Sequence, residues 1–127
     1  MSRNQEETRI LVVEDDPEVR EAAVMLIRSF GFEVVEAEDG SAALEILQSD
    51  FRIDILFSDV VMPKGVNGFE LAREATGLRP GLGIILTSGY PESELEKSGL
   101  SESRFKLLGK PYSRAQLREA LSEALSS

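Results

Sequence analysis

Two residue types that build many functional sites are missing from this chain, which has no cysteine and no histidine. Without cysteine it can form no disulfide and carry out no thiol chemistry. Without histidine it has no imidazole general base, no histidine metal ligand and no phosphohistidine of its own. Any site must therefore be built from carboxylates, hydroxyls, lysine, arginine and backbone groups. Oxygen ligands of this kind suit Mg²⁺, Mn²⁺ or Ca²⁺ better than zinc.

Long apolar runs and positive charge are also scarce. No apolar stretch approaches the roughly 20 residues of a membrane-spanning helix. Residues 1–8 are polar and lack the apolar segment of a signal peptide, so we expect a cytoplasmic protein. The formal net charge of −9 argues against nucleic acid or an anionic membrane as a partner, because both attract a positive surface.

The composition is that of a globular protein. The chain has 127 residues, 42% of them hydrophobic, which is enough for one compact domain with its own core. Residues 1–8 are expected to form a flexible tail and residues 9–125 the domain. Short apolar runs predict strands at Arg9–Val13, Glu33–Ala37, Ile53–Phe57, Gly83–Leu86 and Phe105–Leu108. Helical spacing predicts helices at Pro17–Phe30, Ser41–Ser49, Phe69–Leu78, Pro91–Gly99 and Ser113–Leu125. Gly31 is expected to end the first of these helices and Asn67 to cap the third. Val19, Leu78 and Leu125 are expected on the apolar faces of their helices.

This alternation of strands and helices indicates an α/β fold. Parallel sheets of this kind are covered by helices on both faces. With right-handed crossovers and this chain length, we expect a doubly wound, flavodoxin-like sheet of five parallel strands in the order 2-1-3-4-5. Such sheets bind ligands beyond the carboxyl ends of their strands, so the residues that follow each strand are candidate site residues.

Carboxylates follow two strands that are expected to be neighbours. Glu14 and Asp15 come after the first strand, while Asp16 is suited to cap the helix that begins at Pro17. Asp59 follows the third strand. Taken singly, the acidic run fits a solvated turn and Asp59 a hydrogen-bonding aspartate. Brought together, the three carboxylates of Glu14, Asp15 and Asp59 would raise one another's pKa unless a cation were present, and Mg²⁺ suits this arrangement.

The two remaining strand ends supply a hydroxyl and a cation. Thr87 follows the fourth strand, and Gly89 permits close backbone approach. Lys110 follows the fifth strand and precedes Pro111, which is compatible with a cis bond that would orient the lysine. By default such a lysine forms a structural ion pair. A carboxylate nucleophile, a metal site, a hydroxyl and a cation are nevertheless the parts that phosphoryl transfer needs.

Four motifs together resemble the receiver domain of bacterial two-component response regulators. They are ILVVEDDP, DILFSDVVMP, TSG and GKP, and they occur in the right order at the right strand ends. The resemblance runs over residues 9–125. The TSGY sequence at Thr87–Tyr90 and the long loop after Pro63 are similar to receivers at the C-terminus of hybrid histidine kinases.

The resemblance implies a role for each site residue. Asp59 would be the phosphoacceptor, and Thr87 and Lys110 would contact the phosphoryl group. The implied Mg²⁺ ligands are Glu14, Asp15, Asp59 and the backbone carbonyl of Val61. The donor would be a histidine kinase or a histidine phosphotransfer protein. The domain would catalyse its own phosphorylation and dephosphorylation as a switch rather than as a turnover enzyme.

Two departures from the family pattern stand out. The loop that continues from Lys64 to Gly68 is one residue longer than the common form. The position three before the lysine usually holds an aromatic switch residue, but here it is Leu107, with Phe105 and Tyr112 on either side.

Two other functions compete with the phosphorylation switch. A receiver that only binds proteins and is never phosphorylated fits Leu107, but such modules usually lose part of the acidic pair, the threonine or the lysine. An aspartyl-phosphate hydrolase similar to haloacid dehalogenases would need a second aspartate where the chain has Val61. Whether the domain forms a homodimer is left open by the sequence.

Overall fold

The computed structural model describes residues 8–62, 67–89 and 105–126. Its strands are β1 (Arg9–Val13), β2 (Glu33–Ala37), β3 (Ile55–Asp59), β4 (Gly83–Ser88) and β5 (Lys106–Gly109). Its helices are α1 (Pro17–Ser29), α2 (Gly40–Gln48), α3 (Gly68–Leu78) and α5 (Arg114–Ser126). The strands form one parallel sheet in the order β2-β1-β3-β4-β5, which confirms the predicted fold class and strand order. The predicted helix at Pro91–Gly99 and most of the long loop lie outside the described residues.

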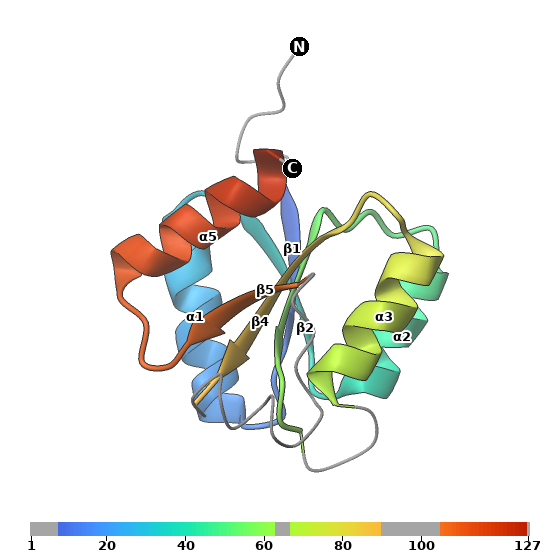
Figure 1. Ribbon diagram of the computed structural model, residues 1–127, viewed down its shortest axis with the longest axis horizontal. Helices are drawn as coiled ribbons and strands as arrows, with labels where there is room; N and C mark the ends of the chain where they lie inside the picture. Colours follow the sequence, from blue (N-terminus) through green and yellow to red (C-terminus); the bar gives the residue numbers. More distant parts are fainter. Residues whose placement is uncertain (1–7, 63–66, 90–104, 127) are drawn as a thin grey trace.

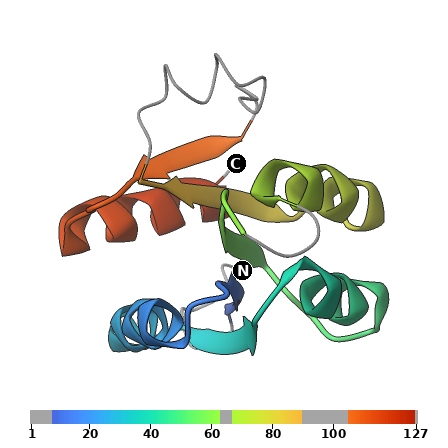
Figure 2. The same ribbon diagram turned by 90° about the horizontal axis from the view of Figure 1, so that it is seen from below.

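Helices cover both faces of the sheet (Figures 1 and 2). α1 and α5 lie on one face, and α2 and α3 lie on the other. The strand β1 is apolar at every central position because it faces a core on both sides. Ile10 and Val12 pack under α1 and α5, whereas Leu11 and Val13 pack under α2 and α3. None of the described helices has the length and apolar character needed to cross a membrane.

Side-chain caps set where the helices begin. The side chains of Asp16 and Asn67 accept hydrogen bonds from backbone N–H groups in the first turns of α1 and α3. At α5, the Gln116 N–H donates to Ser113 Oγ at 3.1 Å and the Ser113 N–H donates to Gln116 Oε1 at 2.7 Å. After α1 the chain turns at Gly31, whose φ of 97° favours glycine. The predicted caps at Asp16 and Asn67 and the stop at Gly31 are confirmed.

The strand β3 begins two residues later than predicted, at Ile55 rather than Ile53. The cause lies at Asp54, whose N–H donates to the Arg9 carbonyl at 2.8 Å and whose carboxylate accepts from the Arg9 N–H at 2.8 Å. The Arg9 N–H therefore donates to a side-chain oxygen of Asp54, whereas in regular strand pairing it would donate to a backbone carbonyl. Regular pairing begins only after Asp54, so β3 runs from Ile55 to Asp59.

Among the residues that the structure describes, burial differs from the sequence prediction at four positions. Val19, Leu78 and Leu125 were assigned to apolar helix faces, but their exposed fractions are 41%, 43% and 42%. Each lies in the first or last turn of its helix. Thr8 was assigned to the flexible tail, but it is buried and its carbonyl accepts from the Glu33 N–H at 3.0 Å.

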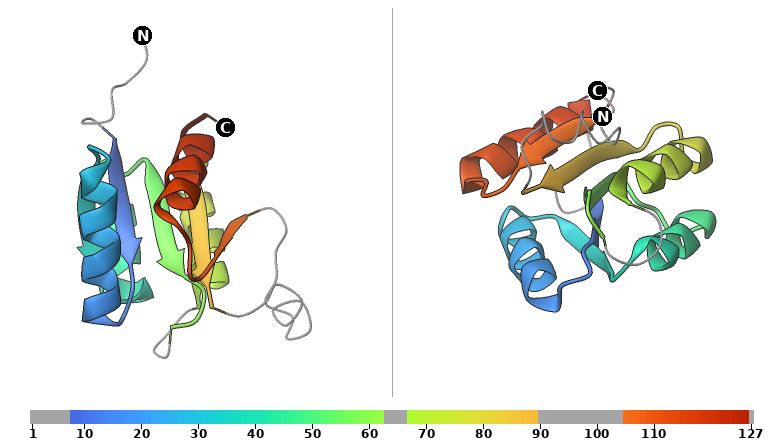
Figure 3. Two further views of the ribbon diagram at one scale, coloured as in Figure 1. Left: turned by 90° about the vertical axis from the view of Figure 1, so that its left-hand side faces the viewer. Right: turned by 60° about the horizontal axis from the view of Figure 1, so that its bottom comes forward.

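The carboxyl ends of the parallel strands gather at one edge of the sheet (Figure 3). Short backbone bonds tie the chain together there. The Val60 N–H donates to the Thr87 carbonyl at 2.9 Å, and the Lys110 N–H donates to the Ser88 carbonyl at 2.8 Å. The start of α3 is tied to the same edge, because the Gly68 N–H donates to the Val60 carbonyl at 2.8 Å.

Gly68 is the point where α3 approaches β3 most tightly. A Cβ at this position would overlap the Asp59 carbonyl oxygen and lie 2.7 Å from the Val60 Cα. We therefore expect Gly68→Ala to lower the free energy of unfolding by about 1–3 kcal/mol, the usual cost of overpacking. Urea unfolding would measure it. Gly77→Ala in the same helix is the control, because nothing lies within 4 Å of its added Cβ; it should raise the free energy by about 0.5–1 kcal/mol. Equal effects of the two variants would contradict the expected clash.

Candidate functional site

The three predicted carboxylates do converge at the carboxyl edge of the sheet. Glu14 directly follows β1, Asp15 comes next, and Asp59 is the last residue of β3. Each of the three offers a carboxylate oxygen within 4.8 Å of the other two. They converge because β1 and β3 are adjacent in the sheet, with Val13 paired to Ser58. Side chains 45 residues apart in the sequence therefore share one site.

Glu14 is buried and held at several points. Its N–H donates to the Ala37 carbonyl of β2 at 3.2 Å. Its side-chain Oε2 accepts from the Asp16 N–H at 3.0 Å. The residue is only 6% exposed, so the carboxylate is fixed rather than free in solvent.

Lys110 brings a positive charge to these carboxylates. Its Nζ lies 3.5 Å from a carboxylate oxygen of Glu14 and 3.5 Å from one of Asp59. The bond from its N–H to the Ser88 carbonyl fixes its backbone, and its peptide bond to Pro111 is cis. The lysine therefore bridges the ends of β1 and β3 from the end of β5.

The charges at this edge are not balanced. Burial raises the pKa of Asp59 above its ordinary value, Lys110 opposes this, and the charge of Asp15 adds to it. Burial also raises the pKa of Glu14; the Asp16 N–H lowers it, the Asp15 side chain raises it, and Asp59 raises it further. One lysine does not compensate for three carboxylates. Such a cluster favours a bound cation.

Two further predicted site residues lie beside Asp59. Thr87 on β4 is paired in register with Asp59 and is 2% exposed. Val61 is two residues beyond Asp59 and is 42% exposed. The contact of the Thr87 hydroxyl with a phosphoryl group and the Val61 carbonyl as a metal ligand remain predictions.

Tyr112 is a site neighbour whose position the sequence motifs did not reveal. Its ring packs edge-on against Phe57, with centroids 6.3 Å apart and an angle of 87° between the planes. Burial raises the pKa of its phenol, and the charges of Glu14 and then Asp59 raise it further. The tyrosine thus lies near the carboxylates on the α1 and α5 side of the sheet. Because β5 side chains alternate between the faces of the sheet, Leu107 packs on the opposite, α3 side.

Arg20 is a second neighbour that no motif indicated. It lies in α1, one turn after the cap at Asp16, and its Nη1 donates to the Glu14 carbonyl at 2.7 Å. Its Nε pairs with the Glu36 carboxylate of β2 at 3.2 Å. Only the three-dimensional fold brings these residues together, so the sequence offered no local signal for the contact.

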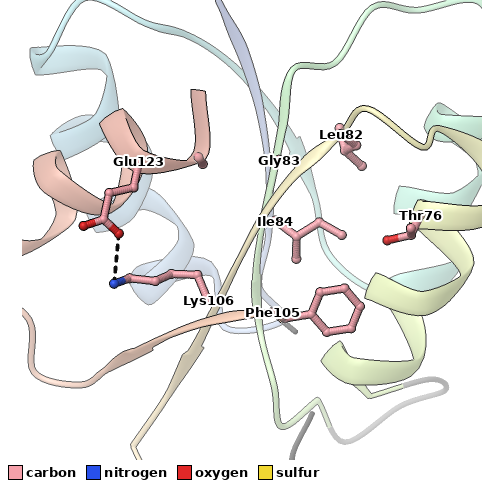
Figure 4. A pocket seen from close by; sticks show the side chains of 8 residues that line it. Thr76, Leu82, Gly83, Ile84, Phe105, Lys106 and Glu123 are labelled. Carbon is pink, nitrogen blue, oxygen red and sulfur yellow. Dashed lines mark ion pairs between the residues drawn. The ribbon is translucent and has the colours of Figure 1, made fainter. Parts of the chain in front are cut away.

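A cavity of about 470 Å³ lies away from this site (Figure 4). Its lining includes Ile84 near the start of β4, Phe105 just before β5, and an ion pair between Lys106 and Glu123 of 3.1 Å. Thr87 and Asp59 lie toward the other end of the strands. The cavity is therefore separate from the carboxylate cluster.

The architecture and this cluster match a known family. The family model described as the response regulator receiver domain matches residues 10–122. The chain belongs to this family. Receiver domains of two-component systems interact with histidine kinases or phosphotransfer proteins and typically bind Mg²⁺. The acidic cluster of Glu14, Asp15 and Asp59 fits such an ion, because Mg²⁺ prefers one or two carboxylates together with water.

Two curated relatives are receivers in different settings. The chain is 38% identical over 117 residues to the sensor kinase CckA of Brucella abortus, a match covering 91% of this chain and 12% of that protein. It is 34% identical over 115 residues to the response regulator receiver protein CpdR of the same organism, covering 91% of this chain and 92% of that one. The chain thus spans a small part of the first relative and most of the second.

Solved structures agree with this placement. A receiver protein from Sinorhizobium medicae superposes with a TM-score of 0.83 at 28% identity, covering 94% of this chain and 95% of that one. The receiver domain of the hybrid histidine kinase CckA superposes with a TM-score of 0.75 at 37% identity, covering 92% and 98%. The predicted resemblance to hybrid-kinase receivers is confirmed.

The raised pKa of Asp59 predicts how stability depends on pH. Folding raises the pKa of the Asp59 carboxyl when no divalent cation is present. Such a carboxyl contributes fully to the free energy of unfolding at pH values below its pKa in the unfolded chain, near pH 4. This contribution is lost as the pH rises through its pKa in the folded protein. In EDTA, Asp59→Asn should therefore raise the free energy of unfolding at pH 7. Urea unfolding from pH 4 to 7 should show the difference from the wild type closing toward about pH 4. A variant less stable than the wild type at pH 7 would contradict the expectation.

Tyr112 offers a direct measurement of the site's charge. The chain has two tyrosines, so Tyr90→Phe leaves Tyr112 as the single phenol. In that background, ultraviolet absorbance titration should give a phenol pKa above the ordinary value. Adding Asp59→Asn should lower this pKa, because one of the charges that disfavour the phenolate is removed. Adding Asp50→Asn, which removes an exposed carboxylate elsewhere, is the control and should leave it unchanged. Identical pKa values in all three proteins would show that Tyr112 does not sense the site.

Proposed function

We propose that this domain accepts a phosphoryl group on Asp59 and changes conformation to pass on a signal. The donor is a phosphohistidine on a histidine kinase or a histidine phosphotransfer protein in the cytoplasm. The observation that carries the proposal is the convergence of Asp59 with Glu14 and Asp15, with the Lys110 ammonium 3.5 Å from both Asp59 and Glu14.

The chemistry requires a nucleophile, a leaving group and compensation of charge. A carboxylate oxygen of Asp59 attacks the phosphorus as the bond from phosphorus to the donor imidazole nitrogen breaks, and the imidazole leaves neutral after taking a proton from solvent. Lys110 is placed to neutralise negative charge on the phosphoryl oxygens. When bound, Mg²⁺ supplies the remaining positive charge. It would be held by Glu14, Asp15, Asp59 and the carbonyl of Val61.

The new charge also gives a basis for signalling. A phosphoryl group adds about −1.5 to −2 charges, by analogy with phosphoserine. Thr87 of β4 is paired in register with Asp59. Movement of the Thr87 hydroxyl toward the phosphoryl oxygens would therefore shift the end of β4. Leu107 packs on the α3 side with Val60 and Leu86. The change is therefore carried without an aromatic ring at position 107.

One alternative remains, a receiver that binds partners without phosphorylation. Leu107 in place of the usual aromatic favours it. The complete acidic cluster with Lys110 at 3.5 Å opposes it, because clustered carboxylates cost stability unless a cation binds among them. The hydrolase alternative has no support, since Val61 stands where its second aspartate would be.

The test is intact-mass spectrometry after incubation with acetyl phosphate and Mg²⁺. We expect the wild type to gain one phosphoryl group, and the gain to disappear in EDTA. Asp59→Asn should show no gain because the nucleophile is gone. Asp50→Asn, which removes an exposed carboxylate outside the site, should behave as the wild type does.

Either of two results would overturn the proposal. One is a phosphoryl gain that persists in Asp59→Asn. The other is no gain in the folded wild type, with acetyl phosphate or with a phosphorylated histidine phosphotransfer protein as the donor. The second result would favour the interaction module.

A further inference from the structure

The loop that carries Glu14 and Asp15 is held by a brace from a neighbouring helix. The guanidinium of Arg20, in α1, donates through Nη1 to the Glu14 carbonyl at 2.7 Å. The same guanidinium pairs through Nε with the Glu36 carboxylate at 3.2 Å. The Arg20 side chain is 19% exposed. It therefore links β2, α1 and the loop after β1 through fixed, charge-assisted bonds.

Glu14, the residue that Arg20 contacts, also forms bonds through its other polar groups. The Glu14 N–H bonds to the Ala37 carbonyl, and Oε2 accepts from the Asp16 N–H. Oε1 is the oxygen that pairs with Lys110. With its carbonyl bound to Arg20, Glu14 is held through its N–H, its carbonyl and both carboxylate oxygens.

The loop needs such anchoring for an electrostatic reason. Glu14, Asp15 and Asp16 are three consecutive acidic residues, and the first two face Asp59 within 4.8 Å. Their repulsion favours any movement that spreads the carboxylates apart. The Arg20 guanidinium, which is bonded to the Glu14 carbonyl of this loop, opposes that movement. Glu36 holds the guanidinium in place.

We propose that Arg20 is a positioning residue for the divalent-cation site, and that Glu36 orients it. By holding the Glu14 carbonyl, Arg20 keeps the Glu14 and Asp15 carboxylates close to Asp59 before the ion arrives. The electrostatic free energy of bringing these carboxylates together is then part of the free energy of folding, and it does not reduce the affinity for Mg²⁺. The inference rests on the proposed Mg²⁺ site.

A matched control lies at the other end of the same strands, where β1 and β2 begin. Arg9 of β1 pairs through Nε with Glu33 of β2 at 3.1 Å and donates through Nη1 to the Arg52 carbonyl at 3.2 Å. The glutamates of the two pairs are similarly exposed, 51% for Glu33 and 46% for Glu36. Both lie on β2, three residues apart. The two pairs therefore match in type and exposure, but only the pair of Arg20 and Glu36 contacts the carboxylate loop.

The experiment measures Mg²⁺ affinity and stability in the same proteins. Isothermal titration with MgCl₂ gives the dissociation constant, and urea unfolding in EDTA gives the stability of the metal-free protein. Arg20→Ala should weaken Mg²⁺ binding about tenfold, as removal of supporting residues does at other metal sites. Arg20→Lys should recover part of the loss, because one ammonium can reach the Glu14 carbonyl or Glu36 but not form both bonds in the same geometry.

The glutamate variants separate positioning from general stability. Glu36→Gln should weaken Mg²⁺ binding by a smaller factor than Arg20→Ala. Glu33→Gln should change stability about as much as Glu36→Gln while leaving the Mg²⁺ dissociation constant unchanged. If Arg20→Ala does not fold, the comparison of Glu36→Gln with Glu33→Gln decides the matter.

Wild-type Mg²⁺ affinity in folded Arg20→Ala would overturn the inference while leaving the proposed function intact. So would equal weakening by Glu33→Gln and Glu36→Gln, because the effect would then follow from stability alone. A folded wild type that does not bind Mg²⁺ would overturn the metal site itself, and the inference with it.

Discussion

Electrostatic repulsion at one edge of the sheet is the constraint on which the site depends. Folding brings the carboxylates of Glu14, Asp15 and Asp59 within 4.8 Å of one another, and burial raises the pKa of Glu14 and Asp59. Lys110 compensates only part of this charge. Such a cluster of carboxylates is electrostatically unfavourable by itself and is stabilised by added positive charge.

The backbone around the site connects this charge to the rest of the molecule. Val60, next to Asp59, is bonded to Thr87 on β4 and to Gly68 at the start of α3. Lys110 is bonded to Ser88 at the end of β4. The residue after Asp59 is therefore hydrogen-bonded to β4 and to α3, and the residue after β5 is hydrogen-bonded to β4. The two faces of the sheet differ in what lies nearby, with Tyr112 on the α1 and α5 side and Leu107 on the α3 side.

Much of the fold and of the candidate site could be predicted because the signals are local or follow from topology. Short apolar runs and helical spacing located the elements, and the caps at Asp16 and Asn67 marked where helices begin. Because strands one and three are adjacent in the predicted order, the proximity of Asp59 to Glu14 could be predicted without any knowledge of side-chain contacts. The helix-end residues Val19, Leu78 and Leu125 were assigned to apolar helix faces but are exposed, because periodicity identifies a helix face but not where the layer that covers it ends.

The sequence by itself determined the chemistry available, because a chain without cysteine or histidine can build this site only from carboxylates, hydroxyls and lysine. It also determined the strand order, since short apolar runs alternating with helices allow few topologies. Only the tertiary structure decided how the carboxylates are held. Arg20 reaches the Glu14 carbonyl, and Tyr112 lies near the carboxylates. Contacts of this kind depend on the distance and direction between packed elements, which no spacing within the sequence encodes.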